Sequence, residues 1–174
     1  MELVMNSNEL KALQTPLKEQ YAKTPDDAIV SLNATGAVNI DNLTCQVESA
    51  ASVNSHTTSG LHPSAGGDGN FACSGDMLLQ SLVACSGVTF AAVATAMELH
   101  ISATRVTAHG TMDFRGTLGV NREVPIGLTS IHLSFAVETS ESEDKIEKLI
   151  QLTERYCVVL QTLKNSVAVS SRRC

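Results

Sequence analysis

Two cysteines that fall in helical segments are the residues best suited to carry chemistry. Cys85 lies near the middle of residues 74–100, an apolar stretch that opens with Ser-Gly-Asp, and Cys157 lies in a second segment with apolar residues at helical spacing. A thiolate can attack a peroxide to give a sulfenic acid, which a second thiol condenses to a disulfide. The residues alone leave two alternatives open, a peroxidatic and resolving pair or two inert core thiols.

The remaining cysteines, histidines and glycines indicate neither a metal nor a nucleotide. The five cysteines are odd in number, are widely spaced and contain no Cys-x-x-Cys, so we expect reduced thiols rather than a disulfide framework or a zinc site. His56, His62 and Cys73 have spacings that fit no standard metal pattern. The Gly-rich residues 66–69 lack the Lys-Ser/Thr ending of a P-loop. We therefore expect no cofactor.

A cysteine in the middle of a helix requires help to become a thiolate. The helix dipole acts only within the first and last turns, so Cys85 needs a neighbouring positive group. Asp76 precedes Cys85 by nine helical residues, which is roughly 13 Å of rise. A contact between the start of this helix and Cys85 therefore requires another chain or a ligand.

Composition and charge are typical of one soluble domain. The chain has 174 residues, of which 43% are hydrophobic and 17% are charged, and its net charge of −6 argues against nucleic-acid binding. No positive region followed by an apolar stretch opens the sequence, so we expect a cytoplasmic protein. Residues 77–97 are long enough to span a membrane, but polar residues interrupt them and no Lys or Arg anchors their ends. We expect a soluble helix that is buried on nearly every side, and no membrane association.

The periodicity of apolar residues predicts mixed helices and strands. Leu10, Leu13, Leu17 and Tyr21 indicate an amphipathic helix. Alternating residues predict two strands, at 30–34 and 43–47, before a Ser/Thr/Gly-rich loop over residues 50–75.

After the central helix, alternation predicts an antiparallel hairpin of residues 102–115 and 131–138. Ser140 and Glu143 form the pattern of a capping box, and Ile146, Leu149 and Cys157 lie on the apolar face of the helix that follows, with Cys157 at or near its end. Val167 and Val169 suggest a closing strand. The order of these elements predicts an α+β fold.

Three motifs stand out along the chain: the Gly-rich lead-in to SGDMLLQSLVAC, the segment DFRGTLGV and the later RYCVVLQTL. Together they resemble the OsmC/Ohr family of thiol-dependent hydroperoxide reductases, and the likeness covers roughly residues 28–171. The resemblance implies a single OsmC-like domain over residues 1–174, with residues 1–24 as an N-terminal helical extension. It further implies antiparallel sheets around long central helices in an intertwined homodimer.

The resemblance also implies an activity, the reduction of organic hydroperoxides in oxidative or osmotic stress protection. Cys85 would be the peroxidatic cysteine and Cys157 the resolving one, recycled by a dithiol reductant, and Asp76 matches a carboxylate of some branches. The family's usual Arg from the N-terminal strands has no counterpart before Arg105. A cation could come instead from Arg105, Arg115, Arg122 or the loop histidines His56 and His62. We name His62 as the best candidate, because it lies in the loop that leads into the helix. The alternative is a non-catalytic OsmC-like dimer whose thiols are structural and which binds a small apolar ligand.

Overall fold

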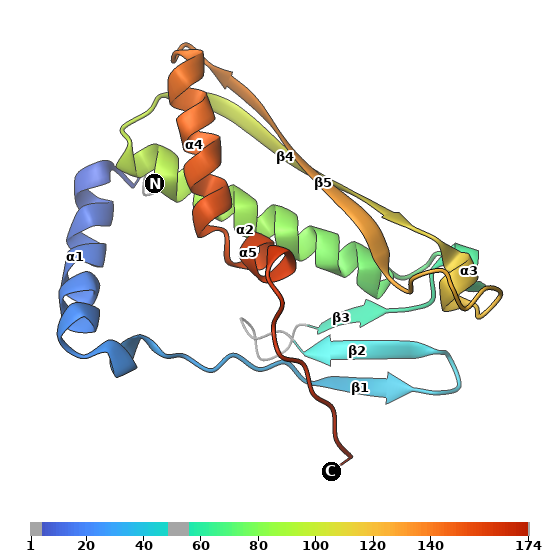
Figure 1. Ribbon diagram of the computed structural model, residues 1–174. Coiled ribbons are helices and arrows are strands. Elements are labelled where there is room, and N and C mark those ends of the chain that lie inside the picture. The colour runs from blue at the N-terminus through green and yellow to red at the C-terminus, as the bar shows by residue number, and fades with distance from the viewer. Residues whose placement is uncertain (1–4, 49–55, 174) are drawn as a thin grey trace. The chain divides into compact units, whose positions relative to one another are not determined.

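The longest helix of the chain, α2, spans Ser74–Ala96 and confirms the predicted central helix (Figure 1). A computed structural model describes residues 5–48 and 56–173 of the chain. The buried side chains of α2 lie four residues apart and so form one stripe, made of Leu82, Ser86, Phe90 and Ala94. The prediction that this helix is buried on nearly every side is wrong for the single chain, because other faces remain open and Val88, for example, is 73% exposed.

The described residues form two compact units. The first, which we call the helical unit, comprises residues 5–26, 81–108 and 133–173. The second, which we call the sheet unit, comprises the other described residues, from 27 to 80 and from 109 to 132. Helix α2 contributes residues to both units. The single domain over residues 1–174 stays a prediction.

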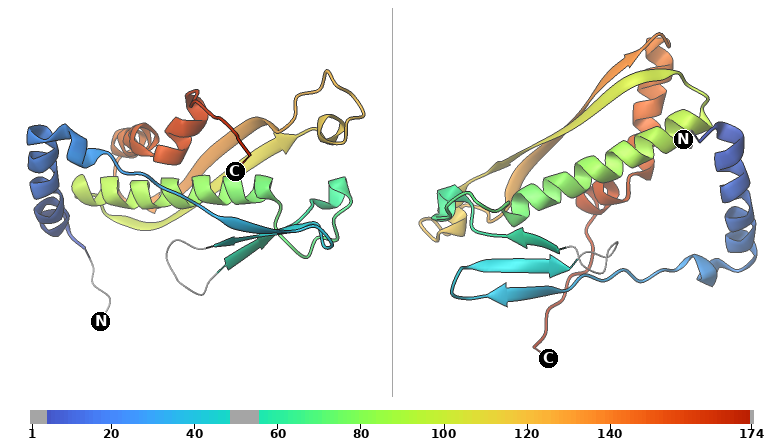
Figure 2. Two further views of the ribbon diagram at one scale, coloured as in Figure 1. Left: turned by 90° about the horizontal axis from the view of Figure 1, so that it is seen from below. Right: turned by 180° about the vertical axis from the view of Figure 1, so that it is seen from behind.

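Two further helices of the helical unit, α4 (Glu143–Tyr156) and α5 (Val158–Lys164), are separated only by Cys157. Figure 2 shows both of them beside α2. The buried core cluster lies between α2 and α4 and consists of Phe90, Ala94, Ile146 and Leu149. This packing confirms the predicted apolar face of α4. Helix α5 was not predicted, because its seven residues are too few to display a helical period.

The start of α4 differs from the prediction. Its N-cap is Ser142, which makes no side-chain cap hydrogen bond, so the capping box predicted for Ser140 and Glu143 is wrong. Glu141 lies just before the helix instead. Its carboxylate accepts a hydrogen bond from the Lys145 Nζ at 2.6 Å and another from the backbone N–H of His100 at 3.1 Å. This carboxylate therefore connects the first turn of α4 to His100, the residue just before the strand that begins at Ile101.

Strands β4 (Ile101–Met112) and β5 (Leu128–Thr139) form a two-stranded sheet and confirm the predicted hairpin (Figure 1). The Thr129 hydroxyl donates to the carbonyl of Thr111 at 3.1 Å, and the Thr139 hydroxyl donates to the carbonyl of His100. Bonds that join the end of one strand to the beginning of the other are those of antiparallel strands.

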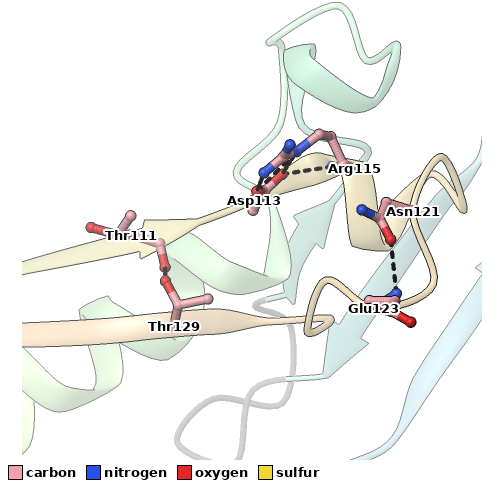
Figure 3. Close-up of polar contacts among 6 residues, drawn as sticks. All are labelled: Thr111, Asp113, Arg115, Asn121, Glu123 and Thr129. Atoms are coloured by element: carbon pink, nitrogen blue, oxygen red, sulfur yellow. Dashed lines mark hydrogen bonds and ion pairs between the residues drawn. The ribbon is translucent and has the colours of Figure 1, made fainter.

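The connection of this hairpin contains a short helix, α3 (Phe114–Thr117), where a long turn was predicted. Figure 3 shows side-chain contacts at the start of α3 and in the turn that follows it. Asp113 accepts the backbone N–H of Arg115 at 3.0 Å and also pairs with its guanidinium, while Asn121 accepts the backbone N–H of Glu123 at 2.9 Å. Hydrogen bonds from the Arg115 side chain and backbone lower the pKa of Asp113 to about 2.

The sheet unit contains the antiparallel strands β1 (Gly36–Asn39), β2 (Thr44–Glu48) and β3 (His56–Ser59), in that order. Strand β2 confirms the second predicted strand, with Cys45 and Val47 on its half-buried side. The first predicted strand, at residues 30–34, is wrong, because β1 begins only at Gly36 and Leu32 is 91% exposed.

Strand β3 lies within residues 50–75, which were predicted as a loop. Its sequence, His-Thr-Thr-Ser, contains no apolar residue, so apolar alternation could not identify it. A 3₁₀ turn, η2 (Pro63–Ala65), follows it.

The two ends of the described chain differ in how well they follow the predictions. Helix α1 (Ser7–Lys23) confirms the N-terminal helix, and a capping box between Asn6 and Glu9 begins it. A 3₁₀ turn, η1 (Pro25–Ala28), follows it. The predicted closing strand is wrong, because Val167 and Val169 lie in a segment without regular structure and are 60% and 88% exposed.

Candidate functional site

Cys85 and Cys157 come together within the helical unit. Helix α2 carries Cys85, and the junction between α4 and α5 carries Cys157. Both are free thiols, and a hydrogen bond from the Cys157 side chain acts on Cys85. Cys157 is fully buried, whereas Cys85 is half-buried. An oxidant that arrives from solvent therefore meets Cys85 first.

Cys157 occupies the break between two helices and confirms the prediction that it lies at a helix end. Its backbone is extended, with φ −71° and ψ 108°, and it is both the C-cap of α4 and the N-cap of α5. Because a helix begins immediately afterwards, the first backbone N–H groups of α5 have no intrahelical acceptor. Those of Val158 and Val159 are therefore available to the sulfur of Cys85.

Several donors lower the pKa of the Cys85 thiol below its ordinary value. Burial by itself raises this pKa, but hydrogen bonding by the backbone N–H of Val159, by the Cys157 side chain and by the backbone N–H of Val158 outweighs it. The Thr89 hydroxyl also lies near, yet its single proton goes to the Cys85 carbonyl at 2.8 Å. We therefore attribute the lowered pKa to the two backbone amides and to Cys157.

A serine that the sequence analysis did not single out contacts the second cysteine. The Ser86 Oγ lies 3.3 Å from the Cys157 Sγ, and both side chains are fully buried. A buried hydroxyl in an apolar helix is a signal that sequence can offer, but only the structure identifies the thiol as its partner. The backbone donors of Val158 and Val159 were missed too, because every residue except proline carries a backbone N–H and the sequence does not mark which of them meets a thiol.

Asp76, the predicted carboxylate, lies in the first turn of α2 within the sheet unit. Its Oδ2 accepts the backbone N–H of Cys73 at 3.3 Å, which is the second half of a capping box. This contact gives Asp76 a structural role at the start of α2. Its catalytic role stays a prediction.

His62, the predicted cation, also belongs to the sheet unit. Its Nδ1 accepts the backbone N–H of Ser64 at 3.0 Å, and its ring stacks on Phe114 with the centroids 4.8 Å apart. The accepting Nδ1 carries no proton, so a positively charged imidazole would have to break this hydrogen bond. The role of His62 beside Cys85 stays a prediction.

Arg115, one of the arginines considered as a cation, forms an ion pair with Asp113. Within residues 5–48 and 56–173, no group of three or more His, Cys, Asp or Glu side chains could hold a metal ion.

An apolar groove runs along α2 and β4 in the helical unit. It has a volume of about 410 Å³, and the residues that line it include Phe90, Ala94, Leu99, Ile101 and Val106. A groove of this size and composition suits a small apolar molecule.

Comparison with solved structures identifies proteins of the same fold. An OsmC-like protein from Mycoplasma pneumoniae is 23% identical, with 78% of this chain and 88% of that chain covered and a TM-score of 0.62. An organic hydroperoxide resistance protein from Elizabethkingia anophelis is 14% identical, with 78% and 89% covered and a TM-score of 0.62. The organic hydroperoxide resistance protein OhrB of Bacillus subtilis is 14% identical, with 78% and 91% covered and a TM-score of 0.53.

The fold of these proteins agrees with the mixed helices and antiparallel sheets described above. Helix α2 is long and apolar enough to cross a membrane, and in this structure it supplies Phe90 and Ala94 to the core cluster. No curated protein matches the chain. The model of the OsmC-like protein family matches residues 67–172, which include both Cys85 and Cys157. The chain belongs to the OsmC-like protein family.

Proposed function

We propose that this protein is a two-cysteine thiol peroxidase that reduces organic hydroperoxides and protects the cytoplasm against oxidative or osmotic stress. Cys85 is the peroxidatic cysteine and Cys157 the resolving one. The observation that carries the proposal is the half-buried Cys85 with a lowered pKa and the buried Cys157 beside it. Membership of the OsmC-like family supports the proposal, as does the likeness to two organic hydroperoxide resistance proteins.

The first step oxidises Cys85. Its thiolate attacks the terminal oxygen of the hydroperoxide, so that an S–O bond forms while the O–O bond breaks. The alkoxide leaves and takes up a proton to become the alcohol. The backbone N–H groups of Val158 and Val159 favour this step, because they lower the pKa of Cys85 and increase the thiolate present at neutral pH.

The second step forms a disulfide. The Cys157 thiolate attacks the sulfur of the Cys85 sulfenic acid, the S–S bond forms, and hydroxide leaves and becomes water. A dithiol reductant then exchanges with the disulfide, becomes oxidised itself and returns both cysteines to thiols.

We further propose a homodimer. The single chain exposes apolar side chains both on α2, at Val88, and before and within the first sheet, at Ile29, Val30, Leu32, Val38 and Ile40. Apolar surface of this extent favours association. Sedimentation of the full chain should give twice the chain mass, and a species of one chain mass would contradict the proposal.

The activity is tested by adding one equivalent of cumene hydroperoxide to the reduced protein and measuring intact and peptide masses. We expect the loss of two protons and a peptide that joins Cys85 to Cys157. Reaction only at Cys174, or no reaction, would contradict the enzyme. Hydrogen peroxide serves as the comparison, because the apolar groove should favour the organic substrate.

The second candidate is a non-catalytic OsmC-like dimer that binds a small apolar ligand, and the same groove favours it. Under this alternative the two thiols are structural. A long-chain alcohol would then bind in a calorimetric titration, while cumene hydroperoxide would leave Cys85 and Cys157 as thiols.

A further inference from the structure

The hydroxyl of Ser86 has an unusual position for a side chain of an apolar helix. Ser86 is 0% exposed and lies on the same buried stripe of α2 as Leu82 and Phe90. A buried hydroxyl without a hydrogen-bond partner is costly. The Oγ of Ser86 has its partner in the Sγ of Cys157, 3.3 Å away.

The protonation of Cys157 decides which of these two atoms donates. With Cys157 as a thiol, either atom can be the donor, and whenever the single Cys157 proton goes to the Cys85 sulfur the donor is Ser86. Once the thiol has lost its proton, the sulfur can only accept, and the Ser86 O–H becomes the donor. A hydrogen bond to a charged acceptor is stronger than one between neutral groups. Ser86 therefore interacts more strongly with the reactive form of Cys157 than with its resting form.

We infer that Ser86 is a positioning residue of the resolving step, which holds the Cys157 sulfur and donates to its thiolate. The inference rests on the proposed peroxidase function. The Cys157 thiolate supplies the electron pair of the new S–S bond, the S–O bond of the Cys85 sulfenic acid breaks, and hydroxide departs. The Ser86 proton stays on its oxygen throughout, so the hydroxyl is neither consumed nor oxidised.

The test separates the two chemical steps in a single turnover. Reduced protein is mixed with one equivalent of cumene hydroperoxide, and samples are quenched over time with dimedone, which captures the Cys85 sulfenic acid. In Ser86→Ala we expect the first oxidation of Cys85 to keep its rate. Disulfide formation should slow by about tenfold to a hundredfold, the loss of one charge-assisted hydrogen bond. Dimedone-labelled Cys85 should accumulate.

A matched pair of variants distinguishes the hydroxyl from packing. Ser86→Thr and Ser86→Val add the same bulk, and only threonine retains the hydroxyl. We expect Ser86→Thr to resolve faster than Ser86→Val by a similar factor. Thr153→Val is the control, because it removes another fully buried hydroxyl that bonds to its own helix, at the Leu149 carbonyl. It should leave both steps unchanged.

The possible results are distinct. Equal resolving rates in Ser86→Thr and Ser86→Val, or a wild-type rate in Ser86→Ala, would overturn the role of Ser86 while the peroxidase stands. If the wild-type protein itself forms no bond between Cys85 and Cys157, the proposed function fails, and the role of Ser86 with it.

Discussion

The carboxylate of Asp76 accepts the backbone N–H of Cys73 at 3.3 Å and so closes the first turn of α2. The side chain thereby satisfies a backbone donor at the start of the helix that carries Cys85. Asp76 was predicted as a catalytic carboxylate from the family resemblance alone. This contact predicts that Asp76 contributes to the stability of α2, which can be measured separately from its effect on turnover.

Replacing Asp76 with alanine should destabilise the protein by about 1 kcal/mol, the usual effect of losing a helix cap. Asp76→Asn retains an acceptor oxygen and should lose less. Urea unfolding measures both variants, and peroxide turnover is measured in parallel. If Asp76→Ala unfolds like the wild type but turns over no hydroperoxide, Asp76 acts in catalysis rather than as a cap.

The two cysteines should fail in different ways. Cys85→Ser should abolish hydroperoxide reduction, because no thiolate remains to attack the substrate. Cys157→Ser should complete one turnover and leave a sulfenic acid on Cys85, which dimedone labelling and peptide mass detect. Cys45→Ser is the matched control, since Cys45 lies half-buried in β2 of the sheet unit. Multiple turnovers by Cys157→Ser would exclude the resolving role.

Val158→Pro should raise the pKa of Cys85. Proline removes one of the backbone N–H donors, and the first position of a helix tolerates it. The extended backbone of Cys157 suits a residue before proline, and Val158 is 69% exposed. Iodoacetamide alkylation of Cys85 against pH should therefore shift its midpoint upward, so that less thiolate is present at pH 7.

Two controls accompany this measurement. Val158→Ala keeps the N–H and should retain the wild-type midpoint, and a shift in it would assign the effect to packing. His62→Ala tests the predicted cation. An unchanged midpoint in His62→Ala would remove His62 from the activation of Cys85.

The Asp113–Arg115 pair should make stability depend on pH at the acid end. The folded-state pKa of Asp113, about 2, lies below its ordinary value of 3.8. A depressed carboxyl pKa stabilises the folded protein above the unfolded value and loses this contribution as pH falls toward 2. The melting temperatures of the wild type and Asp113→Asn should therefore differ most near neutral pH and converge as the pH falls from about 4 to about 2. A difference that grows on acidification would contradict the assignment.

The elements with a long, regular apolar pattern were predictable from the sequence. The central helix, both strands of the hairpin and the apolar face of α4 appear where their periodicity indicates. Short or polar elements were not. Strand β3 has no apolar residue, and the alternation of Val30 and Leu32 lies in an exposed segment without a strand partner.

The candidate site was predictable in its sulfur atoms and not in its surroundings. Cys85 and Cys157 can be chosen from residue type and helical context. The donors that lower the pKa of Cys85 are backbone N–H groups, and every residue except proline carries one. These N–H groups lower the pKa of Cys85 because α5 begins at Val158, and the side chains of Val158 and Val159 do not indicate that a helix begins there.

The break at Cys157 has a consequence for the mechanics of a redox cycle. A disulfide requires a narrow range of separations and dihedral angles, so at least one cysteine must adjust as the bond forms. In an unbroken helix over residues 143–164 the sulfur could be moved only by rotation about its own χ1 angle, because the backbone would be fixed within the turn. At Cys157 the chain is already extended, so small changes in its φ and ψ can shift the thiol as well. The helix break thus gives Cys157 backbone freedom at the residue whose sulfur must approach Cys85.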